Sequence, residues 1–380
     1  MESKIDVYRE LQQHLDELPI GFPGTNSGVE IRLLKNLFTP KEAKIASLLK
    51  FSWNNLESLE SIFKRLESLG YTIKELEKHL DNMAKKGSIK FLKEGNKKFY
   101  GNAMLIIGMF ENQVNKLTKE FIDNTHKYMK EAWFKDLVKV SISQWRTIPI
   151  GINFNHNVSI ANYDDIEKLI NTYEEPIAII NCVCRQAQDL LNNACKVTLR
   201  RELCLGFGQT AQVYIEMGWA RQISKKEAFN YLQKNQEEGL ILQVSNAQNP
   251  EIICSCCSCC CEGLSNLKKL PNPADFVISN YHAKIDLKKC SGCETCKNRC
   301  QMKAIEIKND SYFINLRRCI GCGNCVITCP SDAIKLHRKE KLNIPPNTHE
   351  DLYKKISKLK IKVKERELKR KSRIERRVKN

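Results

Sequence analysis

Eight cysteines near the C-terminal end of the chain form two copies of one spacing. In each copy, three cysteines separated by two residues are followed by a fourth after three more residues: Cys290-x2-Cys293-x2-Cys296-x3-Cys300 and Cys319-x2-Cys322-x2-Cys325-x3-Cys329. Three thiolates at this spacing can converge on one iron–sulfur cubane, while the fourth points toward a neighbouring cluster. The repeat therefore predicts two 4Fe-4S clusters within one short segment.

The repeat resembles the bacterial-type ferredoxin domain, which carries two 4Fe-4S clusters. The resemblance implies that each cluster takes three ligands from one motif and the fourth from the other: Cys290, Cys293, Cys296 and Cys329 for cluster 1, and Cys319, Cys322, Cys325 and Cys300 for cluster 2. Similar strands are expected at 301–307 and 330–336, as two halves related by a pseudo-twofold axis require. Gln301 stands where the family usually has proline, so the turn that directs Cys300 is less constrained.

Zinc and disulfides are less consistent with this spacing. Zinc sites usually show two C-x2-C pairs separated by a longer spacer. Disulfides need an oxidising compartment, and residues 1–6 contain no apolar signal region. We therefore expect a protein of the reducing cytoplasm, and of an anaerobic cell, in which the thiolates serve as iron ligands.

Ten of the eighteen cysteines precede the repeat. Four of them follow a predicted buried strand at 176–180 and could together close one metal site: Cys182, Cys184, Cys195 and Cys204. The other six share eight consecutive positions: Cys254, Cys256, Cys257, Cys259, Cys260 and Cys261. Adjacent cysteines point to opposite sides of the chain, so we do not expect all six to reach one metal.

Three uses of these ten cysteines remain open: a third iron–sulfur cluster or another metal, a dithiol redox relay, or structural zinc. We favour a further metal site, because soft thiolates in a reducing cell seldom stay unligated in such groups. Its candidate ligands are Cys182, Cys184, Cys195, Cys204, Cys254, Cys256, Cys257 and Cys259. Cys195 is also consistent with a buried thiol, and Arg185 beside Cys184 would lower a thiolate pKa.

The first part of the chain predicts three helices and a hairpin. Capping boxes at Thr39–Glu42 and Thr72–Glu75 predict two helix starts, and Gly87 predicts the end of the later helix. A turn-rich loop at 93–98 joins two short predicted strands. This order, over residues 29–110, resembles a winged helix-turn-helix, a module that binds DNA or docks proteins. Its third helix would offer these side chains to a DNA major groove: Lys74, Lys78, His79, Lys85 and Lys86.

The formal net charge of +18 is concentrated at the C-terminal end. Residues 335–380 hold 18 Lys and Arg against 6 Asp and Glu, a surplus of 12 that leaves 6 for the rest of the chain. Apolar residues recur there at steps of four, three and four, which predicts a basic amphipathic helix: Leu352, Ile356, Leu359 and Val363. Such a helix could bind an acidic protein, nucleic acid or anionic lipid. The same pattern is equally consistent with a solvated helix or frayed terminus that binds nothing.

The predicted fold class is a multidomain α+β protein with a winged helix, a central α/β cysteine-rich region, a ferredoxin-like two-cluster domain and a basic helical tail. The expected bounds are 1–28 for an N-terminal helix and linker, 29–110 for the winged-helix-like domain, 111–270 for the cysteine-rich domain, 280–340 for the ferredoxin domain and 345–380 for the tail.

These features favour an iron–sulfur electron-transfer protein that passes electrons to or from a partner oxidoreductase. The alternative is a redox-responsive winged-helix regulator that binds DNA. The histidines are scattered singly and form no catalytic constellation, so we lean against an enzyme and leave that question open for the cysteine-rich middle. The longest apolar run, 103–110, is far shorter than the ~20 residues that cross a bilayer, so no transmembrane segment is expected.

Overall fold

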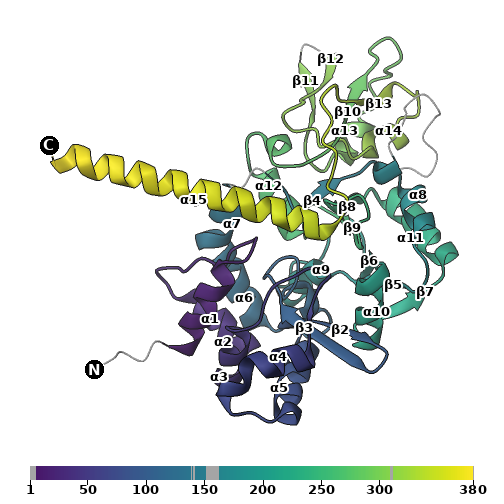
Figure 1. The fold of residues 1–380 in the computed structure, drawn as a ribbon. Helices are drawn as coiled ribbons and strands as arrows, with labels where there is room; N and C mark the ends of the chain where they lie inside the picture. The colour runs from purple at the N-terminus through teal and green to yellow at the C-terminus, as the bar shows by residue number, and fades with distance from the viewer. Residues whose placement is uncertain (1–5, 138, 140–141, 151–161, 309–310, 380) are drawn as a thin grey trace. The chain divides into compact units, whose positions relative to one another are not determined.

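The computed structural model describes residues 6–137, 139, 142–150, 162–308 and 311–379. The chain divides into two compact units, one formed by Met1–Ile142 with His349–Asn380 and the other by Ser143–Thr348 (Figure 1). Both contain helices and strands, so the expected mixture of helix and sheet is confirmed. Within the described ranges, no helix is both long enough and apolar enough to cross a membrane.

Helices dominate the first unit. In chain order they are α1 (Val7–Asp16), α2 (Val29–Leu37), α3 (Pro40–Ala46), α4 (Leu59–Leu66), α5 (Ile73–Lys86), α6 (Lys119–Tyr128), α7 (Phe134–Leu137) and α15 (His349–Lys379), with short helical turns at Glu67–Leu69, Glu111–Gln113 and Met129–Trp133. A three-stranded antiparallel sheet has the order β1 (Glu57–Ser58), β3 (Lys97–Asn102), β2 (Ile89–Glu94). Helix α3, strand β1, helices α4 and α5 and the β2–β3 hairpin therefore follow one another along the chain.

Local sequence signals fix the ends of α3 and α5. The Thr39 hydroxyl accepts a hydrogen bond from the Glu42 N–H, and the Glu42 carboxylate accepts one from the Thr39 N–H. Thr72 and Glu75 form the same reciprocal pair at the start of α5. Gly87 ends α5 with a φ of 76°, in the left-handed region that favours glycine. Both predicted capping boxes and the predicted helix end are confirmed.

Residues 111–142 belong to the first unit, whereas we expected a boundary near residue 110. Helix α6 accounts for the difference. It buries Phe121 and Ile122 and is joined to α2 by hydrogen bonds, one of them from Arg32 to Asn124. The apolar face of α6 thus completes the helical core of the first unit.

Helix α15 follows the second unit in the chain but packs as part of the first (Figure 1, yellow). Leu352 and Ile356 are fully buried. The Trp53 ring stacks on the rings of His349 and Tyr353, with centroid distances of 4.8 Å and 5.1 Å. The predicted tail helix is confirmed, and its first turns use their apolar residues within the protein's own core.

A six-stranded sheet forms the centre of the second unit. Its order is β4 (Trp145–Thr147), β8 (Ile241–Ser245), β9 (Ile252–Cys256), β6 (Glu202–Gly206), β5 (Ile177–Asn181), β7 (Ala220–Ile223), and every pairing is antiparallel. The expectation of an α/β region is corrected in this respect, since that class uses parallel strands. The helices around the sheet are α8 (Ile166–Thr172), α9 (Val183–Leu190), α10 (Gly208–Glu216), α11 (Lys225–Glu238) and α12 (Glu262–Lys268).

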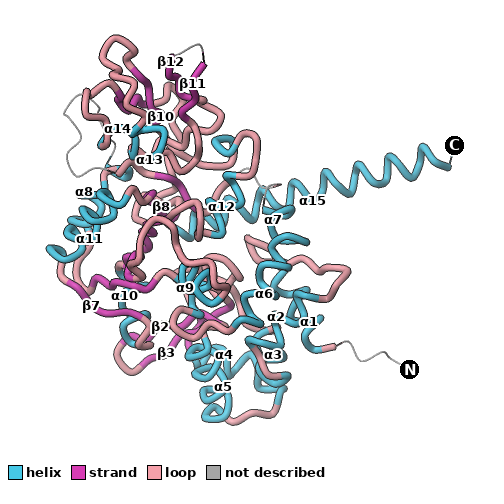
Figure 2. Tube along the Cα trace, turned by 180° about the vertical axis from the view of Figure 1, so that it is seen from behind, coloured by secondary structure: helices cyan, strands magenta, loops and turns pink. Residues whose placement is uncertain are grey.

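The two faces of this sheet differ in composition. One face carries Ile179, Leu205 and Ile253 and is covered by α8 and α11, which lie side by side in both views (Figures 1 and 2). Because side chains alternate along a strand, the intervening residues point to the other face. Cys204 of β6 lies directly opposite Cys254 of β9 there. The sheet therefore separates an apolar core from a cysteine-rich face.

The two-motif segment forms two similar halves. The first consists of β10 (Tyr281–Ile285), α13 (Thr295–Arg299) and β11 (Ile305–Lys308), and the second of β12 (Ser311–Ile314), α14 (Asn324–Ile327) and β13 (Ile334–Arg338). Strand β10 pairs with β13, and β11 pairs with β12, both antiparallel. Strands therefore follow both motifs, as the proposed pseudo-twofold relation requires.

Candidate metal centres

The first cavity in the two-motif segment has a volume of about 300 Å³. The cysteines that line it are Cys290, Cys293, Cys296 and Cys329, the set expected for cluster 1. Cys293 is exposed, and hydrogen bonds from Thr295 lower its pKa. The Ala333 N–H donates to the Cys329 sulfur at 3.2 Å. The cavity thus brings together four thiols, one of them at the protein surface.

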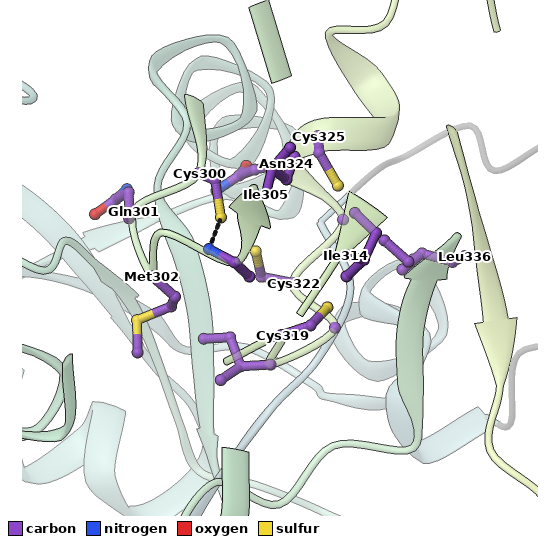
Figure 3. Close-up of a pocket in the computed structure, with 15 residues that line it drawn as sticks. Cys300, Gln301, Met302, Ile305, Ile314, Cys319, Cys322, Asn324, Cys325 and Leu336 are labelled. Atoms are coloured by element: carbon purple, nitrogen blue, oxygen red, sulfur yellow. Dashed lines mark hydrogen bonds between the residues drawn. The ribbon is translucent and has the colours of Figure 1, made fainter. Parts of the chain in front are cut away.

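The second cavity has a volume of about 410 Å³ and is shown in Figure 3. The cysteines that line it are Cys300, Cys319, Cys322 and Cys325, the set expected for cluster 2. Burial raises the pKa of Cys322 to about 12 and raises that of Cys319 and Cys325. The Ala304 N–H donates to the Cys300 sulfur at 3.2 Å, which repeats the bond found at Cys329. Both cavities have the donor set that a 4Fe-4S cluster requires, and the ligand roles stay predictions.

Gln301 lines the second cavity and is hydrogen-bonded to the turn that follows β9. Its side-chain oxygen accepts a hydrogen bond from the Ser258 N–H at 2.7 Å, and its side-chain nitrogen donates to the Gly239 carbonyl. Asn324 donates to the same carbonyl at 2.9 Å. Gly239 ends α11, so these amides cap free carbonyl groups there. The position that departs from the ferredoxin pattern therefore has a structural role, which its sequence neighbours do not reveal.

Six of the ten upstream cysteines form a closed ring of neighbouring thiols, here called the six-thiol ring. In order around the ring they are Cys182, Cys184, Cys261, Cys256, Cys254 and Cys204, and each thiol lies close enough to the next to shift its pKa. Strand β6 carries Cys204, and β9 carries Cys254 and Cys256. Cys182 and Cys184 lie at the start of α9, and Cys261 immediately precedes α12.

The thiols of the six-thiol ring shift one another's pKa. Interactions with neighbouring thiols lower the pKa of Cys182, Cys254 and Cys261, to about 5 for Cys254. They raise the pKa of Cys184, Cys204 and Cys256. Six convergent sulfurs exceed the four that one tetrahedral ion or one cubane uses.

The remaining four cysteines form a second, tighter group, here called the four-thiol site. Its members are Cys195, Cys257, Cys259 and Cys260, whose sulfur atoms all lie within 4.8 Å of one another. Three of them come from the turn between β9 and α12, which is closed by a hydrogen bond from the Cys261 N–H to the Cys257 carbonyl at 3.1 Å. Cys195 reaches the site from the segment after α9.

Arg185 lies between the two thiol groups and is almost fully buried. Its guanidinium donates to the Cys182 sulfur at 3.2 Å and to the Ser255 carbonyl at 3.1 Å. The nearby sulfurs of Cys182, Cys257 and Cys195 raise the pKa of Arg185, although burial opposes this shift. One permanent positive charge thus faces both groups of potential anions.

A buried apolar cluster connects the six-thiol ring with the second cavity. Its core includes Ile241 and Leu264 beside the ring and Met302 and Ile320 beside the cavity. Cysteines of both sites belong to it or pack against it: Cys256, Cys254, Cys261, Cys300 and Cys322. A second cluster, centred on Tyr281 and Leu336, likewise joins cysteines of the two cavities.

The structure distributes the predicted third-site ligands over two groups. Cys182, Cys184 and Cys204 lie in the six-thiol ring, whereas Cys195 lies in the four-thiol site. Two cysteines that the predicted ligand set left out, Cys260 and Cys261, complete the two groups. Two adjacent pairs, Cys256–Cys257 and Cys260–Cys261, are divided between the groups as expected, whereas adjacent Cys259 and Cys260 both lie in the four-thiol site.

Residues 289–334 match the family described as 4Fe-4S dicluster domain. The match supports the expected ferredoxin-type domain and indicates iron–sulfur clusters as its cofactors. No similar protein was found among the curated proteins. No solved structure matched the chain either.

Proposed function

We propose that this protein is an electron-transfer protein with two 4Fe-4S clusters in the two cavities and a third iron–sulfur centre in the six-thiol ring. Such clusters, when bound, exchange single electrons with neighbouring centres. The chain contributes the thiolate ligands, their burial and the N–H to sulfur hydrogen bonds at Cys300 and Cys329, which tune a cluster's potential.

The apolar cluster between the second cavity and the six-thiol ring is the observation that carries this proposal. Cys322 of the cavity and Cys256 of the ring contribute to one continuous apolar cluster together with Met302 and Ile320. A dry, low-dielectric layer controls solvent access and potential at a metal site.

The exposed side of the first cavity is the surface where an external redox partner would dock. Cys293 is exposed there, and so are Lys288, Lys289 and Lys297. Complementary charges accelerate the encounter of redox proteins and orient it. We therefore propose an oxidoreductase or electron carrier with an acidic docking face as the partner.

Metal analysis of protein purified without oxygen tests the proposal. We expect clearly more than about eight irons and eight sulfides per chain, since two cubanes account for eight of each. The double variant Cys254→Ser, Cys256→Ser should fall to about eight while keeping the electron paramagnetic resonance signals of two reduced cubanes. Cys293→Ser is the reciprocal variant: it removes a proposed ligand of cluster 1, so it should lose iron from the first cavity while keeping the third centre. Iron at about eight in both the wild type and the ring variant would refute a third iron–sulfur centre.

A second candidate is a redox-responsive DNA-binding regulator, which the element order of the first unit favours. Helix α3, strand β1, helices α4 and α5 and the β2–β3 hairpin follow the order of a winged helix. Helix α5 exposes Lys74, Lys78 and Lys85. The positive charge of α5 is partly balanced, however, by its own carboxylates, two of which, Glu77 and Asp81, pair with Lys98 at 2.9 Å and 2.8 Å.

Binding of duplex DNA at several salt concentrations separates the two candidates. A regulator should keep sequence-dependent affinity at raised salt, and Lys74→Glu with Lys78→Glu should abolish it. Weak binding that is equal for all sequences and disappears with salt would leave electron transfer as the function.

A further inference from the structure

The sulfur positions of the four-thiol site have the dimensions of a single tetrahedral ion. Zinc–thiolate bonds are about 2.3 Å long, so the sulfurs of a tetrahedral Cys₄ site lie about 3.8 Å apart. The Cys195 sulfur lies 3.6 Å from that of Cys257 and 3.8 Å from that of Cys259. The Cys259 sulfur lies 3.4 Å from that of Cys257 and 3.6 Å from that of Cys260.

The other cysteine groups of the chain provide an internal comparison. Among the described residues, the four-thiol site is the only set of three or more His, Cys, Asp or Glu side chains whose ligand atoms all lie within 4.8 Å of one another. No three cysteines of either cavity meet this limit, which is consistent with ligands that bind the separate irons of a cubane. The tight spacing therefore distinguishes a one-ion site from a cluster site.

The surroundings of the four-thiol site combine burial with positive charge. The Arg185 guanidinium supplies positive charge nearby. Cys257 and Cys260 are at most 1% exposed. Four protein ligands and this burial leave no position for a substrate, which is the pattern of a structural zinc site.

We propose that Cys195, Cys257, Cys259 and Cys260 bind one structural Zn²⁺. The ion cross-links the segment after α9 to the turn between β9 and α12. That turn is flanked by Cys256 and Cys261, which belong to the six-thiol ring. The zinc site thus holds in place two ligands of the proposed iron–sulfur centre without itself exchanging electrons.

Zinc analysis and zinc K-edge X-ray absorption on the full-length wild type test this directly. We expect about one zinc per chain with four sulfur ligands at about 2.3 Å. Zinc well below one per chain after growth with ample zinc would overturn the proposal. A zinc K-edge spectrum that shows nitrogen or oxygen ligands would also overturn it, and so would iron in place of zinc at these four residues.

Variants locate the ion and separate this proposal from the electron-transfer function. Cys260→Ser should lower zinc to below about 0.2 per chain, and Cys260→His, which keeps a zinc ligand, should restore most of it. Cys293→Ser should keep the full zinc content and alter only iron. Loss of zinc in Cys293→Ser, or full zinc in Cys260→Ser, would contradict the assignment, whatever the iron content proves to be.

Discussion

Gln301→Ala tests the connection between the second cavity and the turn that carries three cysteines. The substitution removes the side-chain amide that accepts from the Ser258 N–H and donates to the Gly239 carbonyl. Both partners belong to the second unit, next to the four-thiol site and the end of α11. We expect the turn between β9 and α12 to open more often, while the arrangement of the cysteines around both cavities is unchanged.

The two lost hydrogen bonds have different costs. The Gly239 carbonyl keeps its bond from Asn324 at 2.9 Å, so that loss costs about 0.5–1.5 kcal/mol. The half-buried Ser258 N–H loses its acceptor, which costs about 1–3 kcal/mol. Together they predict that local opening becomes easier by about 1.5–4.5 kcal/mol. Since about 1.4 kcal/mol corresponds to a factor of ten, amide exchange should accelerate by roughly 10-fold to 1,500-fold.

Hydrogen–deuterium exchange of the anaerobic full-length protein measures this effect. Peptides that cover residues 252–268 should exchange faster in Gln301→Ala, whereas peptides from α5 should be unchanged. Asn298→Ala is the matched control, because Asn298 is exposed on the neighbouring helix α13. Unchanged exchange in Gln301→Ala, or equal acceleration in Asn298→Ala, would refute the role assigned to Gln301.

Three further predictions concern the tail, the central sheet and the two cavities. Trp53→Ala removes the ring that stacks on two aromatic side chains of α15 and should cost about 3–5 kcal/mol, which limited proteolysis will detect as faster cleavage within α15. Arg146→Met leaves Asp164 buried without its partner at 3.2 Å and should destabilise the protein by about 3–5 kcal/mol in thermal unfolding. An iron chelator should bleach the cluster of the first cavity before that of the second in a spectroscopic time course, because Cys293 is exposed and the second cavity's cysteines are not.

Each of these predictions has a specific control. Leu368→Ala changes an exposed residue of α15 and should leave its cleavage rate unaltered. Arg221→Met removes a solvent-exposed partner of Glu202 and should cost at most about 1 kcal/mol. Equal effects in variant and control, or simultaneous bleaching of both clusters, would show that burial does not govern these sites.

Sequence reasoning was sufficient where the determinants are local. The capping boxes at Thr39 and Thr72 depend on residues three positions apart, and both formed as predicted. The resemblance of the two cysteine motifs to the ferredoxin domain implied which thiols meet, and the two cavities collect the expected sets. The family match to residues 289–334 supports the same segment.

The division of the ten upstream cysteines required long-range information. Cys204 meets Cys254 only because β6 pairs with β9 in one register, and a shift by one residue would turn either cysteine to the other face. Cys195 lies in an irregular segment whose path no sequence period specifies. Gln301 shows the same limit, since its partners Ser258 and Gly239 are remote in sequence.

An anaerobic reductive titration tests the central claim most directly, because it counts the redox centres that exchange electrons within one chain. The account predicts that the wild type takes up clearly more than about two electrons, the number for two cubanes. The ring variant Cys254→Ser, Cys256→Ser should take up about two, with the signals of both cubanes preserved. Uptake of about two electrons by both proteins would contradict a third redox centre in the six-thiol ring.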